Sequence, residues 1–156
     1  MKILDPLFIQ VIQQLIKSGV DFILIGGYAV NFYGYGRYTG DMDFWLDPTN
    51  SNKLKFIDAL TALKKNADDI KEISELDFTE AQVISIGEEP LRIDFLTKVN
   101  MVKFDEAIQN KNILQLKDFQ VPVVNYDHLI QTKITTGRAK DKADIEELQK
   151  INRDKK

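Results

Sequence analysis

The sequence predicts an α/β fold of the α+β kind, in which helices flank a mixed β-sheet and a helical pair follows at the C-terminal end. Short apolar runs bounded by glycine, proline or acidic residues have the length of buried strands. Longer segments repeat apolar residues at helical spacing, and two of them end the chain. A chain of 156 residues can bury one core, so we expect a single domain over residues 1–156.

The N-terminal half alternates helices with strands. Asp5 can cap a first helix that has Pro6 at its first position, and Ser18-Gly19 ends it. A buried strand is expected at 22–25, and the glycine pair Gly26-Gly27 then turns into a short helix. The elements expected up to residue 76 are this helix at 28–33, a glycine-rich loop at 34–40, a strand from Asp41 to Leu46, a helix at 51–65 and a charged helix at 67–76.

The C-terminal half begins with two strands, AQVISIG and LRIDFLT, around the turn 87–90. Pro122 has no N–H to donate, so the strand-like run FQVPVVN is expected at an edge of the sheet or at a strand end. His128, the sole histidine, falls in the first turn of a helix, and we expect it at the surface. The other elements expected here are a helix at 102–109, a strand at 112–116 and helices at 126–136 and 140–151.

Composition excludes several classes of protein. Without cysteine the chain has no disulfide framework and no thiolate zinc site, and no Cys-His pair is available for catalysis. The formal charge of −3 argues against a strongly basic coat for nucleic acid. No apolar run is long enough to cross a bilayer, and Asp5 interrupts the first one early. We therefore expect a soluble cytoplasmic protein that makes no membrane contact.

Two carboxylates on one strand are the first functional clue. Because side chains alternate along a strand, Asp41 and Asp43 point to the same face, about 6–7 Å apart, while Met42 points into the core. Neighbouring carboxylates repel each other unless a cation lies between them, and Mg2+ is a hard cation that prefers oxygen ligands. The pair is therefore a candidate metal site.

The glycine pair and the loop after it suggest a phosphate site. Gly26 and Gly27 remove side-chain bulk where a backbone must approach a ligand, and the helix that follows offers free N–H groups. Arg37 can pair with phosphate oxygens or with Asp43, or it can be a surface arginine that stabilises the loop. Thr39 is a further candidate for the nucleotide site, or it hydrogen-bonds the turn.

A glycine pair, a spacer of 13 residues (28–40) and Asp-x-Asp resemble the signature of the nucleotidyltransferase superfamily related to DNA polymerase beta. The resemblance implies the nucleotidyltransferase fold, with the glycines on the triphosphate of a nucleotide and Asp41 and Asp43 on Mg2+. The family has a third carboxylate on a later strand. Asp94 in LRIDFL supplies it, either helping to hold a second Mg2+ or accepting a proton from the attacking hydroxyl. Arg92 shares its face and is expected to form an ion pair there.

The C-terminal segment resembles minimal bacterial nucleotidyltransferases of the abortive-infection (AbiEii-like) toxin type. Their pattern is a helix with an inward lysine, then Gly-Arg-x-Lys-Asp and a helix with Asp-Ile and Leu. The resemblance implies that Lys133 meets the triphosphate and that Lys140 can do the same, the alternative for Lys140 and Arg138 being a solvated helix start. The matching residues are Lys133, Gly137, Arg138, Lys140, Asp141, Asp144, Ile145 and Leu148.

Asp141 and Asp144 fall in the first turn of the last helix, where the helix dipole stabilises a carboxylate, so a structural role is expected for both.

This resemblance implies a Mg2+-dependent transferase that uses an NTP such as ATP. A nucleotide would pass to an acceptor hydroxyl on RNA, protein or a small molecule, and pyrophosphate would leave. By analogy the chain can be the toxin of a toxin–antitoxin pair with a cognate antitoxin as partner. The alternative is a catalytically inactive module of the same fold that binds a nucleotide or a partner.

Overall fold

The computed structural model describes residues 4–155 and confirms the mixed α/β architecture. Its six strands form one sheet in the order β3-β4-β2-β1-β6-β5. The pairs β2–β4 and β1–β6 are parallel and the other three pairs are antiparallel. The strands are β1 Phe22–Ile25, β2 Met42–Leu46, β3 Val83–Ile86, β4 Ile93–Leu96, β5 Asn112–Gln115 and β6 Gln120–Val123. The helices are α1 Pro6–Lys17, α2 Gly26–Phe32, α3 Asn50–Ala62, α4 Ala67–Ser74, α5 Phe104–Gln109, α6 Tyr126–Ile134 and α7 Ala139–Asp154.

Helix starts follow the capping residues in the sequence. Asp5 accepts a hydrogen bond from the backbone N–H of Leu7 at 2.8 Å, and Pro6 occupies the first helical position of α1, as expected. Asn66 caps α4, and Asn125 caps α6 by accepting from the backbone N–H of His128 at 2.7 Å. Two starts differ by two residues, since α2 begins at Gly26 rather than at residue 28 and α5 begins at Phe104 rather than at residue 102.

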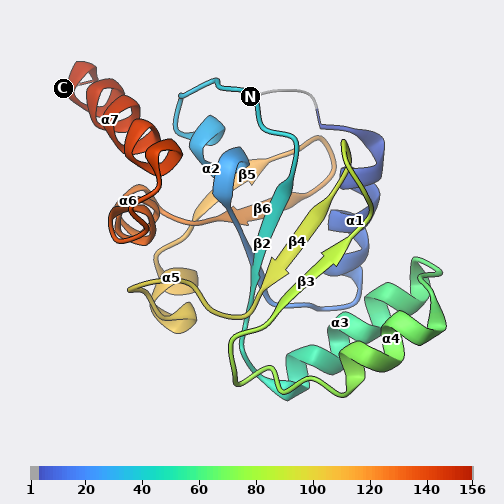
Figure 1. Cartoon of the computed structure of the whole chain (residues 1–156). Helices are drawn as coiled ribbons and strands as arrows, with labels where there is room; N and C mark the ends of the chain where they lie inside the picture. The colour runs from blue at the N-terminus through green and yellow to red at the C-terminus, as the bar shows by residue number, and fades with distance from the viewer. Residues whose placement is uncertain (1–3, 156) are drawn as a thin grey trace.

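The two faces of the sheet have different neighbours. Phe44 on β2 packs edge-to-face against Phe22 and stacks with Phe95, which in turn contacts Phe56 on α3. On the opposite face Trp45 meets Phe104 of α5 edge-to-face. Figure 1 shows the strands between α6 and α7 on one side and α1, α3 and α4 on the other. Because side chains alternate along β2, Asp43 shares the face of Trp45.

Two expectations about the C-terminal half were wrong. Strand β6 lies inside the sheet between β1 and β5, although it contains Pro122. Its parallel pairing with β1 is limited to Leu24 opposite Val123, with a hydrogen bond from Val124 N to Leu24 O, so no N–H is needed from the proline. His128 is 7% exposed rather than at the surface, because the first turn of α6 packs into the core.

Candidate active site

The turn between β1 and α2 is built against Asp43. The antiparallel register places Ile25 opposite Asp43, so Gly26 follows directly beside that carboxylate. Gly26 has φ +70°, which favours glycine, and a Cβ on it would overlap the Oδ2 of Asp43 and lie 2.9 Å from its Cγ. Both the backbone conformation and the contact therefore require glycine at this position.

Gly27 is packed against the glycine-rich loop. A Cβ on Gly27 would overlap the hydroxyl of Thr39 and lie 3.3 Å from Nη1 of Arg37. Thr39 is buried and donates a weak hydrogen bond to the backbone oxygen of Asp41 at 3.3 Å. Thr39 and Arg37 thus lie behind the glycine turn and support it from the loop side.

Three carboxylates meet at one end of β2 and β4. The parallel register pairs Asp43 with Asp94, and Asp41 precedes β2. Asp94 is held by its neighbours, since Arg92 donates two hydrogen bonds to it at 3.1 and 2.9 Å and Ser85 donates one at 2.6 Å. Arg92 also lies 3.8 Å from Asp41, so the expected ion pair is present. No hydrogen bond or ion pair within residues 4–155 reaches the carboxylate of Asp43.

The pKa values of Asp43 and Asp94 shift in opposite directions. Burial, followed by the charges of Asp94 and Asp41, raises the pKa of Asp43 to about 6, against the smaller opposing effects of Lys133 and Arg92. Burial also acts to raise the pKa of Asp94. Hydrogen bonds from Arg92 and Ser85 and the charge of Arg92 outweigh it, so that pKa is lowered. Asp43 is therefore the carboxylate whose negative charge is least compensated by the protein.

The donor set fits a cation best at the Asp-x-Asp pair. Among residues 4–155, Oδ1 of Asp41 is buried without a hydrogen-bond partner, and the carboxylate of Asp43 has neither a hydrogen bond nor an ion pair. Both atoms are oxygens of the kind that Mg2+ prefers. Across the described residues, however, no three histidine, cysteine or acidic side chains are grouped so that they could hold a metal ion. The oxygens of Asp94 face Arg92 and Ser85 instead, so Asp94 could join such a site only after those contacts change.

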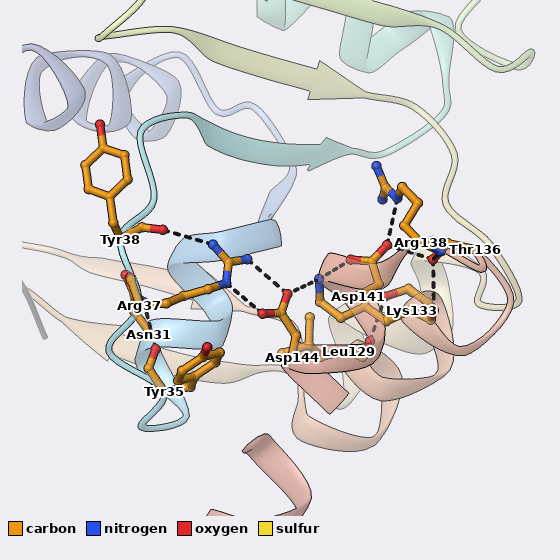
Figure 2. Close-up of polar contacts among 11 residues, drawn as sticks. Asn31, Tyr35, Arg37, Tyr38, Leu129, Lys133, Thr136, Arg138, Asp141 and Asp144 are labelled. Carbon is orange, nitrogen blue, oxygen red and sulfur yellow. Dashed lines mark hydrogen bonds and ion pairs between the residues drawn. The ribbon is translucent and has the colours of Figure 1, made fainter. Parts of the chain in front are cut away.

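Opposite the carboxylates, α6 and α7 present a cluster of ion pairs. Nζ of Lys133 donates to Asp141 at 2.9 Å and to Asp144 at 3.0 Å. Asp144 also accepts two hydrogen bonds from Arg37, at 2.6 and 3.0 Å. Asp141 is bound in addition by Thr136 at 2.7 Å and by Arg138 at 2.8 Å. Figure 2 shows these side chains in one row, with Lys133 between the two carboxylates, Arg37 at one end and Arg138 at the other.

The two carboxylates of this cluster are buried and ionised. Burial acts to raise the pKa of Asp144, but hydrogen bonds from Arg37 and Lys133 and their charges lower it below its ordinary value. For Asp141 burial is likewise outweighed, by hydrogen bonds from Thr136 and Lys133 first. Both residues were expected to be structural because of the helix dipole. Their buried ion pairs with Arg37, Lys133 and Arg138 explain why aspartate is found at both positions better than the helix dipole does.

A pocket of about 350 Å3 joins the two sides. Gly26, Asp43 and Asp94 line one wall, and Lys133 and Arg138 line another. Asp41 and Arg37 are not among the residues that line this pocket.

Lys140 is exposed at the start of α7 and does not reach the pocket, whereas Lys98, just after β4, does. Lys98 has no sequence signal, because only the path of the chain after β4 brings it to this wall.

A larger cavity of about 640 Å3 lies near the other end of β2, between Asp47 and Phe104. It shares Lys98 and Val99 with the first pocket but contains neither the glycine turn nor the carboxylates. The smaller pocket is therefore the candidate site, because Gly26 lies beside the carboxylate of Asp43 on its wall.

Comparison with known proteins agrees with this geometry. Residues 6–156 match a family described as "Nucleotidyl transferase of unknown function (DUF2204)". The chain belongs to this nucleotidyl transferase family. The match covers the glycine turn, all three carboxylates and the α6–α7 cluster, so the nucleotidyltransferase superfamily and transfer of a nucleotidyl group are supported for the chain as a whole.

A solved structure supports the fold of this nucleotidyl transferase. The chain is similar to the lincosamide antibiotic adenylyltransferase LnuA in its lincomycin-bound crystal structure, with a TM-score of 0.55 and 14% sequence identity. The similarity covers 97% of this chain and 99% of that chain. Curated protein sequences contain no match to the chain. No helix within residues 4–155 is both long enough and apolar enough to span a membrane.

Proposed function

We propose that the protein transfers a nucleotide from an NTP to an acceptor hydroxyl in a Mg2+-dependent reaction that releases pyrophosphate. One observation supports this most directly. On one wall of the pocket lies the half-buried carboxylate of Asp43, beside Gly26 and without a partner among residues 4–155, and on the other lies the ammonium of Lys133. A polyphosphate with a bound cation complements both walls at once.

The acidic wall would hold the cation. Asp41 and Asp43 would bind Mg2+, since Oδ1 of Asp41 has no hydrogen-bond partner among the described residues and the negative charge of Asp43 is little compensated. When bound, Mg2+ neutralises triphosphate oxygens and thereby makes the α-phosphorus easier to attack. The family resemblance extends this to two ions, with Asp94 contributing to the second. Arg92 keeps Asp94 ionised, which is the form needed either to bind a cation or to accept a proton.

The basic wall would hold the phosphates. Lys133 lies close enough to Asp43 to lower its pKa, so a triphosphate lying between them would contact Lys133. Within residues 4–155 Arg138 has one carboxylate partner, Asp141, and its side chain is 74% exposed, which leaves its remaining donors for phosphate oxygens. Gly26 lets the turn lie directly against Asp43, because a side chain at this position would collide with that carboxylate.

Acceptor and biological role are further parts of the proposal. By analogy with the abortive-infection toxins that the motifs resemble, the protein would be a toxin that modifies RNA or protein; the motifs themselves do not choose the acceptor. The structural neighbour is named as an antibiotic adenylyltransferase, which adds a small-molecule hydroxyl as an acceptor class to test. ATP is the first nucleotide to test.

The test is incubation of the pure protein with each of the four NTPs labelled at the α-phosphate, with Mg2+. Total bacterial RNA, total bacterial protein and lincomycin serve as separate acceptor pools. Asp43→Asn is the inactive control, and Asp118→Asn, an exposed carboxylate far along the chain, is the matched control expected to stay active. Label on one pool that is lost only in Asp43→Asn supports the proposal. Nucleotide binding without label on any pool would instead favour the inactive binding module.

A further inference from the structure

Asp144 lies behind the basic wall rather than in the pocket. Its side chain is 1% exposed, and it is not among the residues that line the pocket, whereas its partner Lys133 is. The carboxylate uses both oxygens: Oδ1 accepts from Nε of Arg37 at 2.6 Å, and Oδ2 accepts from Nη2 of Arg37 and Nζ of Lys133, each at 3.0 Å. Figure 2 shows Arg37 and Lys133 converging on this one carboxylate from different parts of the chain.

These contacts join two elements that sequence places far apart. Arg37 belongs to the glycine-rich loop, and its Nη1 lies beside Gly27, at 3.3 Å from where a Cβ would be. It also donates to the backbone oxygen of Tyr38 at 3.1 Å. Lys133 belongs to α6 and Asp144 to α7. A planar guanidinium bound through two nitrogens fixes the angle as well as the distance of its partner. Asp144 therefore sets the position of α6 and α7 relative to the glycine turn.

Charge explains why Lys133 needs such a partner. A lysine side chain is a flexible four-carbon chain, so without a fixed partner its ammonium would turn toward the strongest nearby negative charge. Asp43 is such a charge, because it is half-buried, has no hydrogen-bond or ion-pair partner within residues 4–155 and lies close enough to Lys133 for the charge of the lysine to lower its pKa. Direct pairing of the two would occupy the metal ligand and the phosphate ligand together. Asp144 and Asp141 hold the ammonium on the opposite wall instead.

We propose that Asp144 is a positioning residue for nucleotide binding, which acts through Lys133 and Arg37 without touching the nucleotide. This rests on the proposed function, since it assigns Lys133 to the triphosphate. The cluster of three cations and two carboxylates has a net charge of +1, and removal of the Asp144 charge would raise it to +2 while releasing Lys133 and Arg37 from their fixed positions. Affinity would therefore fall although the pocket becomes more positive, which is opposite to the result expected from charge alone.

A double-mutant cycle tests this role. The probe is the Mg2+ complex of α,β-methylene-ATP, which cannot release pyrophosphate, titrated by calorimetry against wild type, Asp144→Asn, Lys133→Met and the double variant. We expect Asp144→Asn to weaken binding about tenfold in the wild-type background and less than about twofold in the Lys133→Met background. Glu146→Gln, an exposed carboxylate-to-amide change on the same helix, is the matched control and should leave binding unchanged.

Equal effects of Asp144→Asn in both backgrounds would overturn the proposal, because a residue that only stabilises the fold does not act through Lys133. Absence of analogue binding by the wild-type protein would instead count against the proposed function, before any variant is compared. Thermal unfolding of each variant confirms that it is folded at the titration temperature. If Asp144→Asn does not fold, Arg37→Lys keeps the charge but loses the two-nitrogen contact. Weaker binding by that variant supports the proposal, and unchanged binding overturns it.

Discussion

Asp43→Asn should stabilise the protein in the absence of divalent metal, although it should abolish transfer. The structure raises the pKa of this carboxylate from 3.8 to about 6 by burial and by the charges of Asp94 and Asp41. A folded-state pKa above the unfolded value means that the folded protein binds more protons between these two pH values. Stability contributed by the protonated carboxyl is therefore lost as the pH rises from about 4 to about 6.

The magnitude follows from the shift. Two pKa units correspond to about 3 kcal/mol, and because Asp43 is partly exposed we expect screening to reduce the effect to about 1–2 kcal/mol. Asparagine has nearly the same shape and no charge, so it removes this penalty. With Mg2+ present the order should reverse, because the wild-type protein gains binding energy that the variant lacks.

Urea unfolding at several pH values, with EDTA and then with Mg2+, measures both effects. In EDTA, Asp43→Asn should have the higher free energy of unfolding above about pH 6, and the difference should disappear near pH 4. Asp118→Asn, whose carboxylate is exposed, should show no such crossover. The reasoning is refuted if Asp43→Asn is less stable than wild type in EDTA at about pH 7.5. The ionised carboxylate of Asp43 would then stabilise the folded protein rather than destabilise it.

Three other perturbations have distinct expected outcomes. Gly26→Ala should abolish transfer and metal-dependent nucleotide binding. The control Gly19→Ala, at a similar φ of +73° but with no atom within 4 Å of the added Cβ, should lose only about 1 kcal/mol of stability. Equal activities of the two variants would contradict the contact between Gly26 and the acidic wall. Lys133→Met should weaken nucleotide binding and also cost about 2–4 kcal/mol in urea unfolding, because it removes a partner from two buried carboxylates; a stability loss without any change in affinity would make Lys133 purely structural. Because their pKa values are lowered in the folded protein, Asp141 and Asp144 contribute stability above about pH 4 that is lost as the pH falls further. The free energy of unfolding of Asp144→Asn should therefore fall less steeply with decreasing pH below about 4 than that of wild type. An unchanged pH dependence would contradict the ionised state of these carboxylates.

The acidic side of the site could be predicted from sequence because it depends on local rules. Alternation along a strand predicted one face for Asp41 and Asp43, and the family resemblance supplied Asp94. The parallel register of β2 and β4 places Asp94 opposite Asp43. The position of the glycine turn could also be predicted locally, because Gly26 directly follows the strand β1, and β1 pairs with the strand that carries Asp43. These predictions required only short segments whose geometry is set by the backbone.

The basic side could be predicted only in part. Arg37 and Asp144 are 107 positions apart, and no local spacing relates them, so the loop arginine could be assigned neither to phosphate nor to this carboxylate. The same limit applies to Lys98, which reaches the pocket through the path of the chain after β4. Pro122 was misplaced because a proline rule assumes full pairing on both sides of a strand, whereas β6 pairs with β1 over very little of its length.

The most direct test of nucleotidyl transfer compares two labels in one reaction. The protein is incubated with Mg2+, the acceptor pool and an NTP labelled either at the α-phosphate or at the γ-phosphate, while released pyrophosphate is measured. Our account predicts that the acceptor gains the α label but not the γ label, in a one-to-one ratio with pyrophosphate, and that Asp43→Asn abolishes both signals. Transfer of the γ label, or transfer that survives in Asp43→Asn, would contradict it.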